Sequence, residues 1–283
     1  MTWESALDRA AKKHVLFLGE TIYDIYHYGK LLARPLKEPI ICVEHQDTEV
    51  FKGGVQAAAS HVKSLVARVN LASSVVISKE RFVEQAKTRK LFEVYGQVGR
   101  LSSPYWPSLR EYDVVAVTDY GHGMMTPQMI ESVCHEAPFL AVNVQANAGN
   151  YGFNLATKYP RANYLCVDEM EARLATQNQH GPIEQSLEAL ARIAPRVVIT
   201  LGSKGAIGLD RAGVHRSEAF ADAVIDTMGS GDAFFAVTAC MAEDAEMPDL
   251  LRIGNAAGKL KAQIMGHRGS VTKDALRRYL ETH

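Results

Sequence analysis

The sequence predicts an α/β fold with a mainly parallel sheet that is covered by helices on both faces. Short, continuous apolar runs bounded by turn residues recur along the 283 residues, and helix-length segments separate several of them. Strands buried on both faces carry such unbroken apolar runs, which is typical of parallel sheets in α/β proteins. We find no internal repeat, low-complexity tract or linker. Residues 1–283 are therefore expected to form a single domain.

The first half of the chain begins with a short amphipathic segment and then alternates between strands and helices. Residues 55–66 are rich in alanine, whose small side chain lets a helix pack closely against a sheet. Residues 79–90 have helical spacing. In order, the predicted elements are a strand at 14–18 that ends at Gly19, an extended run at 39–44, a helix at 55–66, a β-branched strand at 69–77 and a helix at 79–90.

The segment at residues 28–50 does not fit a simple connection between two core strands. It is long and carries charged residues around Pro35 and Pro39, followed by an alternating strand. Connections of this length inside a compact domain are usually functional. We expect a lid or clasp over a site at the strand ends; the alternative is a surface excursion without function.

The second half continues the alternation and then changes to helices alone. Its predicted strands are residues 113–118, 139–144, 163–167, 197–201 and 206–209, and its helices are residues 127–135, 168–176 and 183–193. Two consecutive helices are predicted in the last third, at residues 232–241 and 249–265.

The composition excludes several classes of protein. A hydrophobic content of 47% and a charged content of 22% are ordinary for a soluble globular protein. The formal net charge of -1 gives no basic footprint for nucleic acid or for an anionic membrane. No apolar stretch is long enough to span a bilayer, and residues 1–13 lack the apolar centre of a signal peptide.

The cysteines and histidines give no sign of a disulfide framework or a metal centre. Cys42, Cys134, Cys166 and Cys240 are scattered and form no C-x-x-C pair, so we expect free thiols in a reducing cytoplasm. The ten histidines show no metal-ligand spacing, and no zinc site is expected.

The segment at residues 226–232 carries the strongest chemical signal. It reads Asp-Thr-Met-Gly-Ser-Gly-Asp and runs directly into an apolar helix. Gly229 and Gly231, with Ser230 between them, allow a tight turn that presents N–H groups beside the positive end of the helix dipole. Asp232 stands at the mouth of this anion-binding cradle and could act as a base for a hydroxyl that attacks phosphorus. An ordinary loop with an N-cap aspartate is the equally open alternative.

This segment resembles the D-T-x-G-A-G-D signature of the ribokinase (PfkB) carbohydrate-kinase family. Gly53 and Gly54, before the alanine-rich helix, resemble the family's amino-terminal di-glycine motif, and residues 198–206 resemble its V-x-T-x-G-x-x-G segment. Residues 19–26 and 118–123 are most similar to the kinase domain of ADP-heptose synthases. The motifs are collinear over nearly the whole chain, which makes the resemblance specific for the family and weaker for the substrate.

The resemblance implies a ribokinase-like three-layer sandwich with a small β lid, and a kinase that uses ATP and Mg²⁺ on a sugar or sugar phosphate. The lid, at about residues 28–50, also forms a dimer clasp in some members, which implies a possible homodimer. The implied site residues are Asp232 as catalytic base; Gly229, Ser230 and Gly231 as anion hole; Asp24, Gly53, Gly54 and Asp119 as sugar ligands; Gly202, Ser203, Lys204, Gly205 and Asn255 on the nucleotide side; and Glu171 at the metal.

Each implied role has a plainer alternative. These are a loop cap for Asp24, a tight turn for Gly53 and Gly54, a hairpin turn with a solvated Lys204 for residues 202–205, helix packing for Asn255, and a solvated helix face for Glu171.

Several positions depart from the family pattern. The family's N-x-x-E element, tied to magnesium and phosphate, has aspartate at position 168 in place of asparagine, although Glu171 is kept. Residues 142–145 read Val-Asn-Val-Gln instead of V-D-P-K, and His122 replaces a lysine. We therefore expect an acceptor other than heptose phosphate. The amide-rich run at residues 141–150 suggests a neutral or differently charged ligand, or else a polar loop.

Compared with the family, the chain is expected to lack one strand–helix unit around residues 78–95. Three functions fit these observations: an ATP-dependent sugar kinase, a kinase-fold module that binds a sugar or nucleotide for regulation or assembly, and a vitamin or nucleoside kinase. The intact glycine loop with Asp232 favours the kinase, and the departures favour the module. The fold alone cannot choose among them.

Overall fold

The computed structural model describes residues 2–84, 86, 89–100 and 107–283, and within them a central sheet of eight strands. The strand order is β12-β11-β10-β9-β8-β7-β1-β4; the strands from β4 to β10 are parallel, and β11 and β12 return antiparallel at one edge. The strands are β1 (His14–Gly19), β4 (Arg68–Ala72), β7 (Val114–Asp119), β8 (Leu140–Val144), β9 (Tyr164–Asp168), β10 (Arg196–Thr200), β11 (Ala206–Asp210) and β12 (Gly213–Ser217).

Helices cover both faces of this sheet, as the apolar runs predicted. Alternate residues of β1 enter different cores: Val15 and Phe17 pack on one face, and Leu16 and Leu18 on the other. The first face is covered by α1 (Trp3–Ala10), α2 (Val55–Ser60), α6 (Ser230–Met241), α7 (Met247–Ala262) and α8 (Lys273–Thr282). The second face is covered by α3 (Pro127–Glu136), α4 (Glu169–Thr176) and α5 (Ile183–Leu190). The three-layer α/β prediction is confirmed.

The helix α6 is the structural centre of the first core. Its residues from Ala233 to Met241 are all buried, because the sheet lies on one side and α7 on the other. The two helices approach closely at Gly254, where a Cβ would lie 2.4 Å from Cζ of Phe234. Only glycine fits such a contact without displacing the ring.

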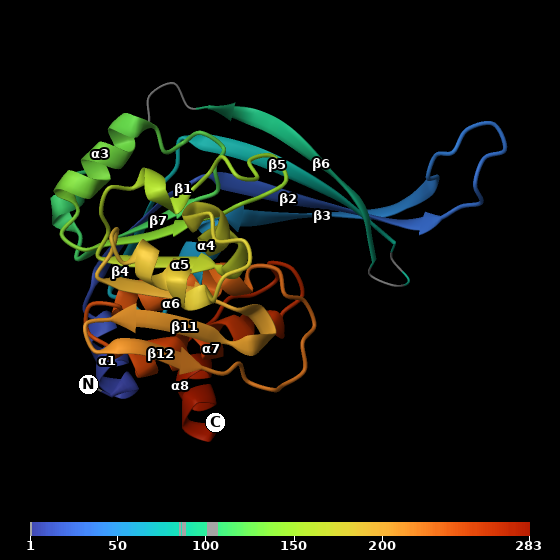
Figure 1. Ribbon diagram of the computed structural model, residues 1–283. Helices are drawn as coiled ribbons and strands as arrows, with labels where there is room; N and C mark the ends of the chain where they lie inside the picture. Colours follow the sequence, from blue (N-terminus) through green and yellow to red (C-terminus); the bar gives the residue numbers. More distant parts are fainter. Residues whose placement is uncertain (1, 85, 87–88, 101–106) are drawn as a thin grey trace.

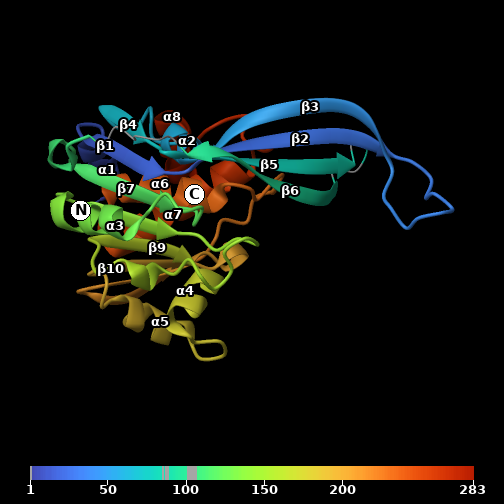
Figure 2. The same ribbon diagram turned by 90° about the horizontal axis from the view of Figure 1, so that it is seen from above.

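Four long strands form a second sheet that projects from the domain, the lid (Figure 1, Figure 2). They are β2 (Thr21–Leu31), β3 (Val43–Gly54), β5 (Val75–Glu84) and β6 (Arg89–Arg100), in the order β3-β2-β5-β6. The β2 and β5 strands are parallel, and the outer pairs are antiparallel. The predicted lid at residues 28–50 is thus only one end of a larger sheet.

Several predicted elements in this region are wrong. The helix at residues 79–90 does not form: residues 79–84 belong to β5 and residues 89–90 to β6, and in β5 Arg81 and Val83 are buried at strand period rather than at helical period. The single strand at residues 69–77 is two strands in different sheets, joined by Ser73 and Ser74. Residues 39–42 are not in a strand, and α2 ends at Ser60 rather than at residue 66.

Other features match the expectations. The strands β7 to β11 and the helices α3 to α7 lie where the apolar runs placed them, with bounds that differ by a few residues. All four cysteines are free thiols. In the described part of the chain, no helix combines the length and apolar character needed to cross a bilayer. A missing strand–helix unit remains a prediction, although β4 leads into the lid with no helix between them.

Candidate active site

The loop before α6 forms the predicted tight turn. Gly229 is the N-cap of α6 and has φ 73°, a conformation that a side chain would strain. The carboxylate of Asp226 fixes this turn with two hydrogen bonds. One oxygen accepts from N of Met228 at 3.1 Å and the other from N of Gly266 at 3.0 Å. A Cβ at Gly231 would meet no atom within 4 Å, so the first turn of α6 faces open space. Ser230 donates its N–H to O of Thr227 at 3.2 Å and Ala233 to O of Gly229 at 2.9 Å, so the N–H groups of Gly231 and Asp232 are the ones in this turn that can bind an anion.

Asp232 lies in the first turn of α6, half-buried beside this loop. Its Oδ1 accepts two hydrogen bonds, from Oη of Tyr120 at 2.9 Å and from Nε2 of Gln145 at 2.7 Å. Burial raises the pKa of Asp232, while the two donors act in the opposite direction. Both bonds engage the same oxygen, which leaves Oδ2 as the atom that can accept a proton from a substrate.

A cavity of about 770 Å³ opens next to this helix end, between the loops that follow β10 and β12 and the helices α6 and α7. Its wall contains six of the predicted site residues: Gly202, Ser203, Gly205, Ser230, Gly231 and Asn255. Lys204 is exposed and is not part of the wall. The buried Oγ of Ser230 has no hydrogen-bond partner among the described residues. A polar group that is buried without a partner is costly, which favours a ligand at this point.

Asn255 contributes to the cavity by holding its wall. The Nδ2 group donates to O and Oγ of Ser217 and to O of Glu218, each at 3.1 Å. The amide nitrogen of Asn255 therefore binds the end of β12 and the loop after it, which agrees with the alternative that Asn255 has a packing role.

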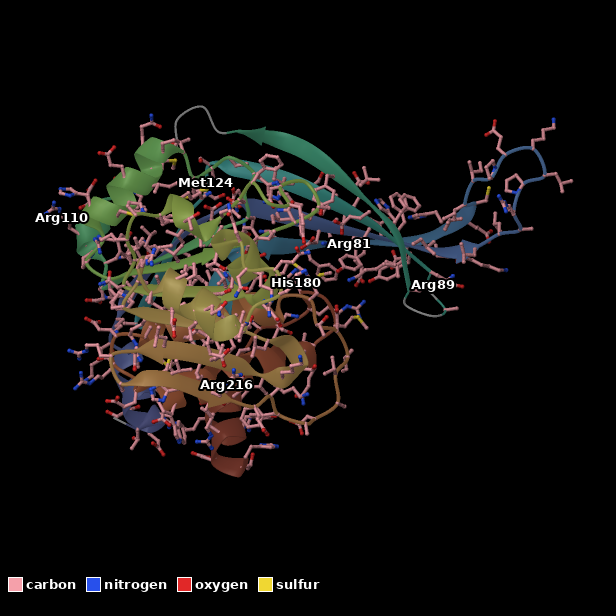
Figure 3. The ribbon with its side chains drawn as sticks, in the orientation of Figure 1. Arg81, Arg89, Arg110, Met124, His180 and Arg216 are labelled. Carbon is pink, nitrogen blue, oxygen red and sulfur yellow. The ribbon has the colours of Figure 1, made fainter. Side chains whose placement is uncertain are left out.

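Asp24 lies on β2 at the base of the lid and is buried. It accepts a hydrogen bond from Nη1 of Arg81 and lies 3.1 Å from Nε2 of His267. Burial favours the neutral acid, but His267 and Arg81 outweigh it and lower the pKa of Asp24. Arg81, marked in Figure 3, also contacts Glu93 on β6 at 2.7 Å. The predicted sugar ligand is thus one member of a charge cluster that spans the lid.

The two glycines of the di-glycine motif are required by close approach. A Cβ at Gly53 would lie 2.2 Å from Oδ2 of Asp24. Gly54 has φ 60°, and a Cβ there would lie 2.4 Å from O of Glu20. The motif therefore lets β3 pass directly against the Asp24 carboxylate.

Asp119 is 1% exposed and does not face open space. One carboxylate oxygen accepts from Oη of Tyr159 at 2.7 Å and lies 2.5 Å from Nζ of Lys158. The other accepts from N of Gly121 at 3.1 Å and from Nδ2 of Asn154. With all these donors in place, Asp119 anchors the loop after β7.

The side-chain amides of residues 141–150 mostly form hydrogen bonds within the protein, and several of them bind the loop after β7. Asn147 and Asn150 both donate to O of Tyr120, at 2.7 and 2.8 Å. Asn143 donates to O of Cys166 at 2.8 Å. Residues 141–144 of the run belong to β8 and the rest forms a polar loop at the end of that strand; from this loop Gln145 donates to Asp232.

Glu171 is hydrogen-bonded to the backbone through both carboxylate oxygens. Oε2 accepts from N of Asp168 at 2.7 Å in a capping box, and Oε1 accepts from N of Ala146 at 3.1 Å. Burial, followed by the charge of Asp168, raises the pKa of Glu171 to about 8. Asp168 and Glu169, not Glu171, line the cavity. No group of three or more potential metal-ligating side chains occurs among the described residues.

Three further residues shape this region without having been predicted from the sequence. Glu20 is fully buried and accepts from N of Tyr120, His122 and Met124. His267 lies between Asp24 and Gly229, and Lys261 is buried directly behind the glycine loop. Glu20 lies in the family-like segment at residues 19–26, but no local sequence pattern points to His267 or Lys261.

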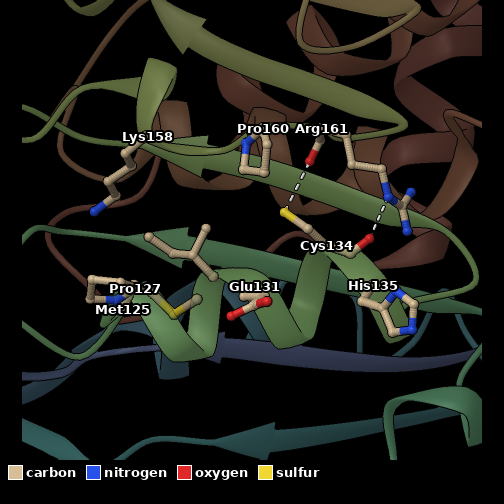
Figure 4. Close-up of a pocket in the computed structure, with 9 residues that line it drawn as sticks. Met125, Pro127, Glu131, Cys134, His135, Lys158, Pro160 and Arg161 are labelled. Carbon is tan, nitrogen blue, oxygen red and sulfur yellow. Dashed lines mark hydrogen bonds between the residues drawn. The ribbon is translucent and has the colours of Figure 1, made fainter.

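A separate hollow of about 540 Å³ lies beside α3 and holds none of the predicted site residues (Figure 4). Cys134 and Arg161 on its wall bond to each other's backbone carbonyls.

Comparison with known sequences gives a family and several relatives. The profile of the pfkB family carbohydrate kinases matches residues 130–274. The bifunctional protein HldE of Bradyrhizobium sp. (strain ORS 278) is 25% identical over 321 residues, which cover 96% of this chain and 64% of that protein. The HldE protein of Caulobacter sp. (strain K31) is 27% identical over 307 residues, covering 93% and 62%. The chain thus spans less than two thirds of the length of these relatives.

The solved structures on which the chain superposes include two ribokinases and a nucleoside kinase. A ribokinase from Thermotoga maritima superposes with a TM-score of 0.72 at 14% identity, covering 95% of this chain and 99% of that one. Arabidopsis thaliana ribokinase, solved with ribose and ATP, gives 0.70 at 17% identity, with coverage of 95% and 99%. A nucleoside kinase from Methanocaldococcus jannaschii gives 0.70 at 15% identity, with coverage of 96% and 100%. The ribokinase-like fold is therefore confirmed.

Proposed function

Because the chain belongs to the pfkB family carbohydrate kinases, we propose that it transfers the γ-phosphoryl group of ATP to a hydroxyl of a sugar or sugar phosphate. The observation that carries this proposal is the position of Asp232. Its carboxylate is held by Tyr120 and Gln145 at the open N-terminal turn of α6, beside a cavity of about 770 Å³. A base, an anion cradle and a nucleotide-sized cavity meet at one helix end.

The proposed reaction is an in-line displacement. Oδ2 of Asp232 takes the proton of the acceptor hydroxyl while the new O–P bond forms and the bond from the γ-phosphorus to the ADP oxygen breaks. The N–H groups of Gly231 and Asp232 would receive the charge on the transferred group. ADP and the phosphorylated sugar leave as products.

The remaining predicted residues take roles around this centre. The adenosine part of ATP would lie in the cavity between residues 202–205 and α7, with Asn255 holding its wall. Asp24, released from Arg81 or His267, would bind acceptor hydroxyls beside Gly53 and Gly54. Asp119 would keep the loop after β7 in place rather than contact the sugar.

Mg²⁺ fits this site as a companion of the nucleotide. Mg²⁺ bound with ATP needs only one or two carboxylates besides the phosphates, and Asp168 and Glu169 lie on the cavity wall. When bound, it would neutralise charge on the phosphates. Glu171 would support Asp168 through the capping box, and a direct contact would require its two backbone hydrogen bonds to open.

The test is calorimetric titration of the protein with ATP–Mg²⁺ and ADP–Mg²⁺, followed by a screen of sugars and sugar phosphates for ADP formation. Binding with phosphorylation of at least one acceptor supports the kinase. Nucleoside and vitamin acceptors in the same screen test the related alternative. Binding without turnover on any acceptor would leave a nucleotide-binding module. No binding of either nucleotide would refute the kinase and leave a module that binds a sugar or another anion.

A pH dependence follows if Asp232 is the base. Activity should fall at acidic pH as Asp232 becomes protonated, and burial places this fall above the pH expected for an exposed aspartate. Tyr120→Phe removes one hydrogen bond to the carboxylate, so the pKa of Asp232 should rise and the acidic limb of the kcat profile should move to higher pH. Tyr159→Phe is the control, because its hydroxyl binds Asp119 instead. An unmoved acidic limb in Tyr120→Phe would contradict the base assignment.

We propose in addition that two copies pair through the lid. His27, Phe82 and Phe92 stack across β2, β5 and β6, with ring centroids 4.6 and 4.4 Å apart. Phe92 is 43% exposed and the neighbouring Val94 is 46% exposed. An apolar surface of this kind is suited to burial against a second copy. Light scattering at working concentration should give twice the mass of one chain; the mass of a single chain would refute the pairing.

A further inference from the structure

Lys261, in the last turn of α7, is a fully buried charged residue. A buried ammonium is costly unless hydrogen bonds replace its water shell. Its Nζ donates to O of Gly266 at 2.7 Å, to O of Met228 at 2.8 Å and, at longer range, to O of Ile264 at 3.4 Å. Three backbone carbonyls therefore surround the group that the chain buries.

The number of acceptors around Lys261 favours its charged form. Carbonyl oxygens only accept hydrogen bonds, and an ammonium has three N–H donors, one for each of the three carbonyls. A neutral amine has only two. Burial lowers the pKa of Lys261, while the charges of Asp226 and Asp232 act to raise it. The side chain is thus a fixed positive charge inside the protein.

This charge lies immediately behind the glycine loop. A Cβ placed on Gly229 would be 3.4 Å from Cε of Lys261. Lys261 and Asp226 both connect the glycine loop, at Met228, to the turn after α7, at Gly266. Lys261 binds the carbonyls of Met228 and Gly266, and Asp226 accepts from their N–H groups. The pair fixes the turn that opens α6, and the ammonium adds positive potential to the N–H groups there.

We propose that Lys261 is a positioning residue for phosphoryl transfer, whose buried ammonium fixes the 226–229 loop and supplies a permanent positive charge beneath the transferred phosphoryl group. This inference rests on the proposed kinase function. Preorganised charge of this kind acts where negative charge gathers in the transition state, and costs no reorganisation during the reaction.

The experiment compares Lys261→Met with the wild type. Methionine keeps an unbranched side chain of similar length, one atom shorter, and removes the charge. We expect kcat to fall roughly 10²-fold, in the range found for loss of one oxyanion-hole donor, with little change in KM for the sugar. By calorimetry, affinity for ATP–Mg²⁺ should fall while affinity for AMP stays the same, because AMP has no phosphate near the glycine loop. Lys273→Met, at the start of α8, is the matched control and should match the wild type in all of these measurements.

A second variant separates charge from folding. Lys261→Gln is neutral but can still donate to two carbonyls, so it should fold even if Lys261→Met does not. Wild-type kcat in Lys261→Gln would overturn the charge role, and so would an equal loss of ATP and AMP affinity in either variant. If the wild type binds ATP but phosphorylates no acceptor, the kinase proposal fails while the ATP-against-AMP comparison still decides the role of Lys261. A wild type that binds neither nucleotide overturns both.

Discussion

Asp232→Asn should reduce turnover by about 10²- to 10⁴-fold, the range for loss of a general base. Asparagine has the shape of aspartate, and its Oδ1 can still accept from Tyr120 and Gln145. The amide that replaces Oδ2 cannot take a proton from the acceptor hydroxyl. The effect should therefore appear in kcat, measured by ADP release at saturating ATP and sugar, while the calorimetric affinity for ATP–Mg²⁺ changes little.

The control for this substitution is Asp274→Asn. Asp274 is exposed in the first turn of α8, away from the cavity wall, and its variant should turn over at the wild-type rate. Thermal unfolding of both variants checks that Asp232→Asn remains folded. Wild-type turnover in folded Asp232→Asn would show that another group, or solvent, takes the proton.

The sequence predicted the central sheet well because its strands are buried on both faces. Runs such as residues 113–118 and 197–201 contain little besides apolar and β-branched residues, and no other element of that length explains them. The glycine loop could also be located from the sequence, and Gly229 has the positive φ that favours glycine. Local chemistry alone specifies both features.

The lid was mispredicted because its strands are only partly buried. Arg81 sits at an inward position of β5, where Asp24 and Glu93 neutralise it, so the apolar alternation of a strand is broken. With that position polar, residues 79–90 match helical spacing better than strand spacing. The β-strand assignment depends on pairing with β2, which is distant in sequence and cannot be derived from a local pattern.

The site residues divide in a similar way. Asp232 and its glycines are close in sequence, and their joint role could be predicted. Tyr120 and Gln145 act on Asp232 only because β7 and β8 end beside α6 in the fold. Lys261 would be assigned to a solvated helix end by composition alone; its burial follows from the turn at residues 264–266 that closes over it.

Glu20→Ala should destabilise the fold more than any surface substitution. The Glu20 side chain is fully buried, and its carboxylate accepts from N of Tyr120 at 3.1 Å, of His122 at 3.0 Å and of Met124 at 3.4 Å. Alanine leaves these three N–H groups without an acceptor in a site closed to water. Each unsatisfied group costs about 1–3 kcal/mol, so the free energy of unfolding should fall by roughly 3 kcal/mol or more.

The ionisation of Glu20 partly offsets this loss. Burial, followed by the charge of Asp119, raises the pKa of Glu20. A carboxyl whose pKa is higher in the folded protein favours folding less as the pH rises through the interval between its unfolded and folded pKa values. Removing it therefore relieves a cost at neutral pH that is absent in acid, and the destabilisation by Glu20→Ala should be larger in acid than at neutral pH.

Denaturant unfolding of Glu20→Ala at several pH values measures both effects. Glu38→Ala is the matched control, because Glu38 is exposed and its variant should stay within about 0.5 kcal/mol of the wild type. A Glu20→Ala variant as stable as this control would mean that water reaches the three N–H groups. A destabilisation that does not change with pH would show that Glu20 has no raised pKa in the folded protein. Because the same N–H groups belong to the loop that carries Tyr120, any loss of order there should also reach Asp232 and lower kcat.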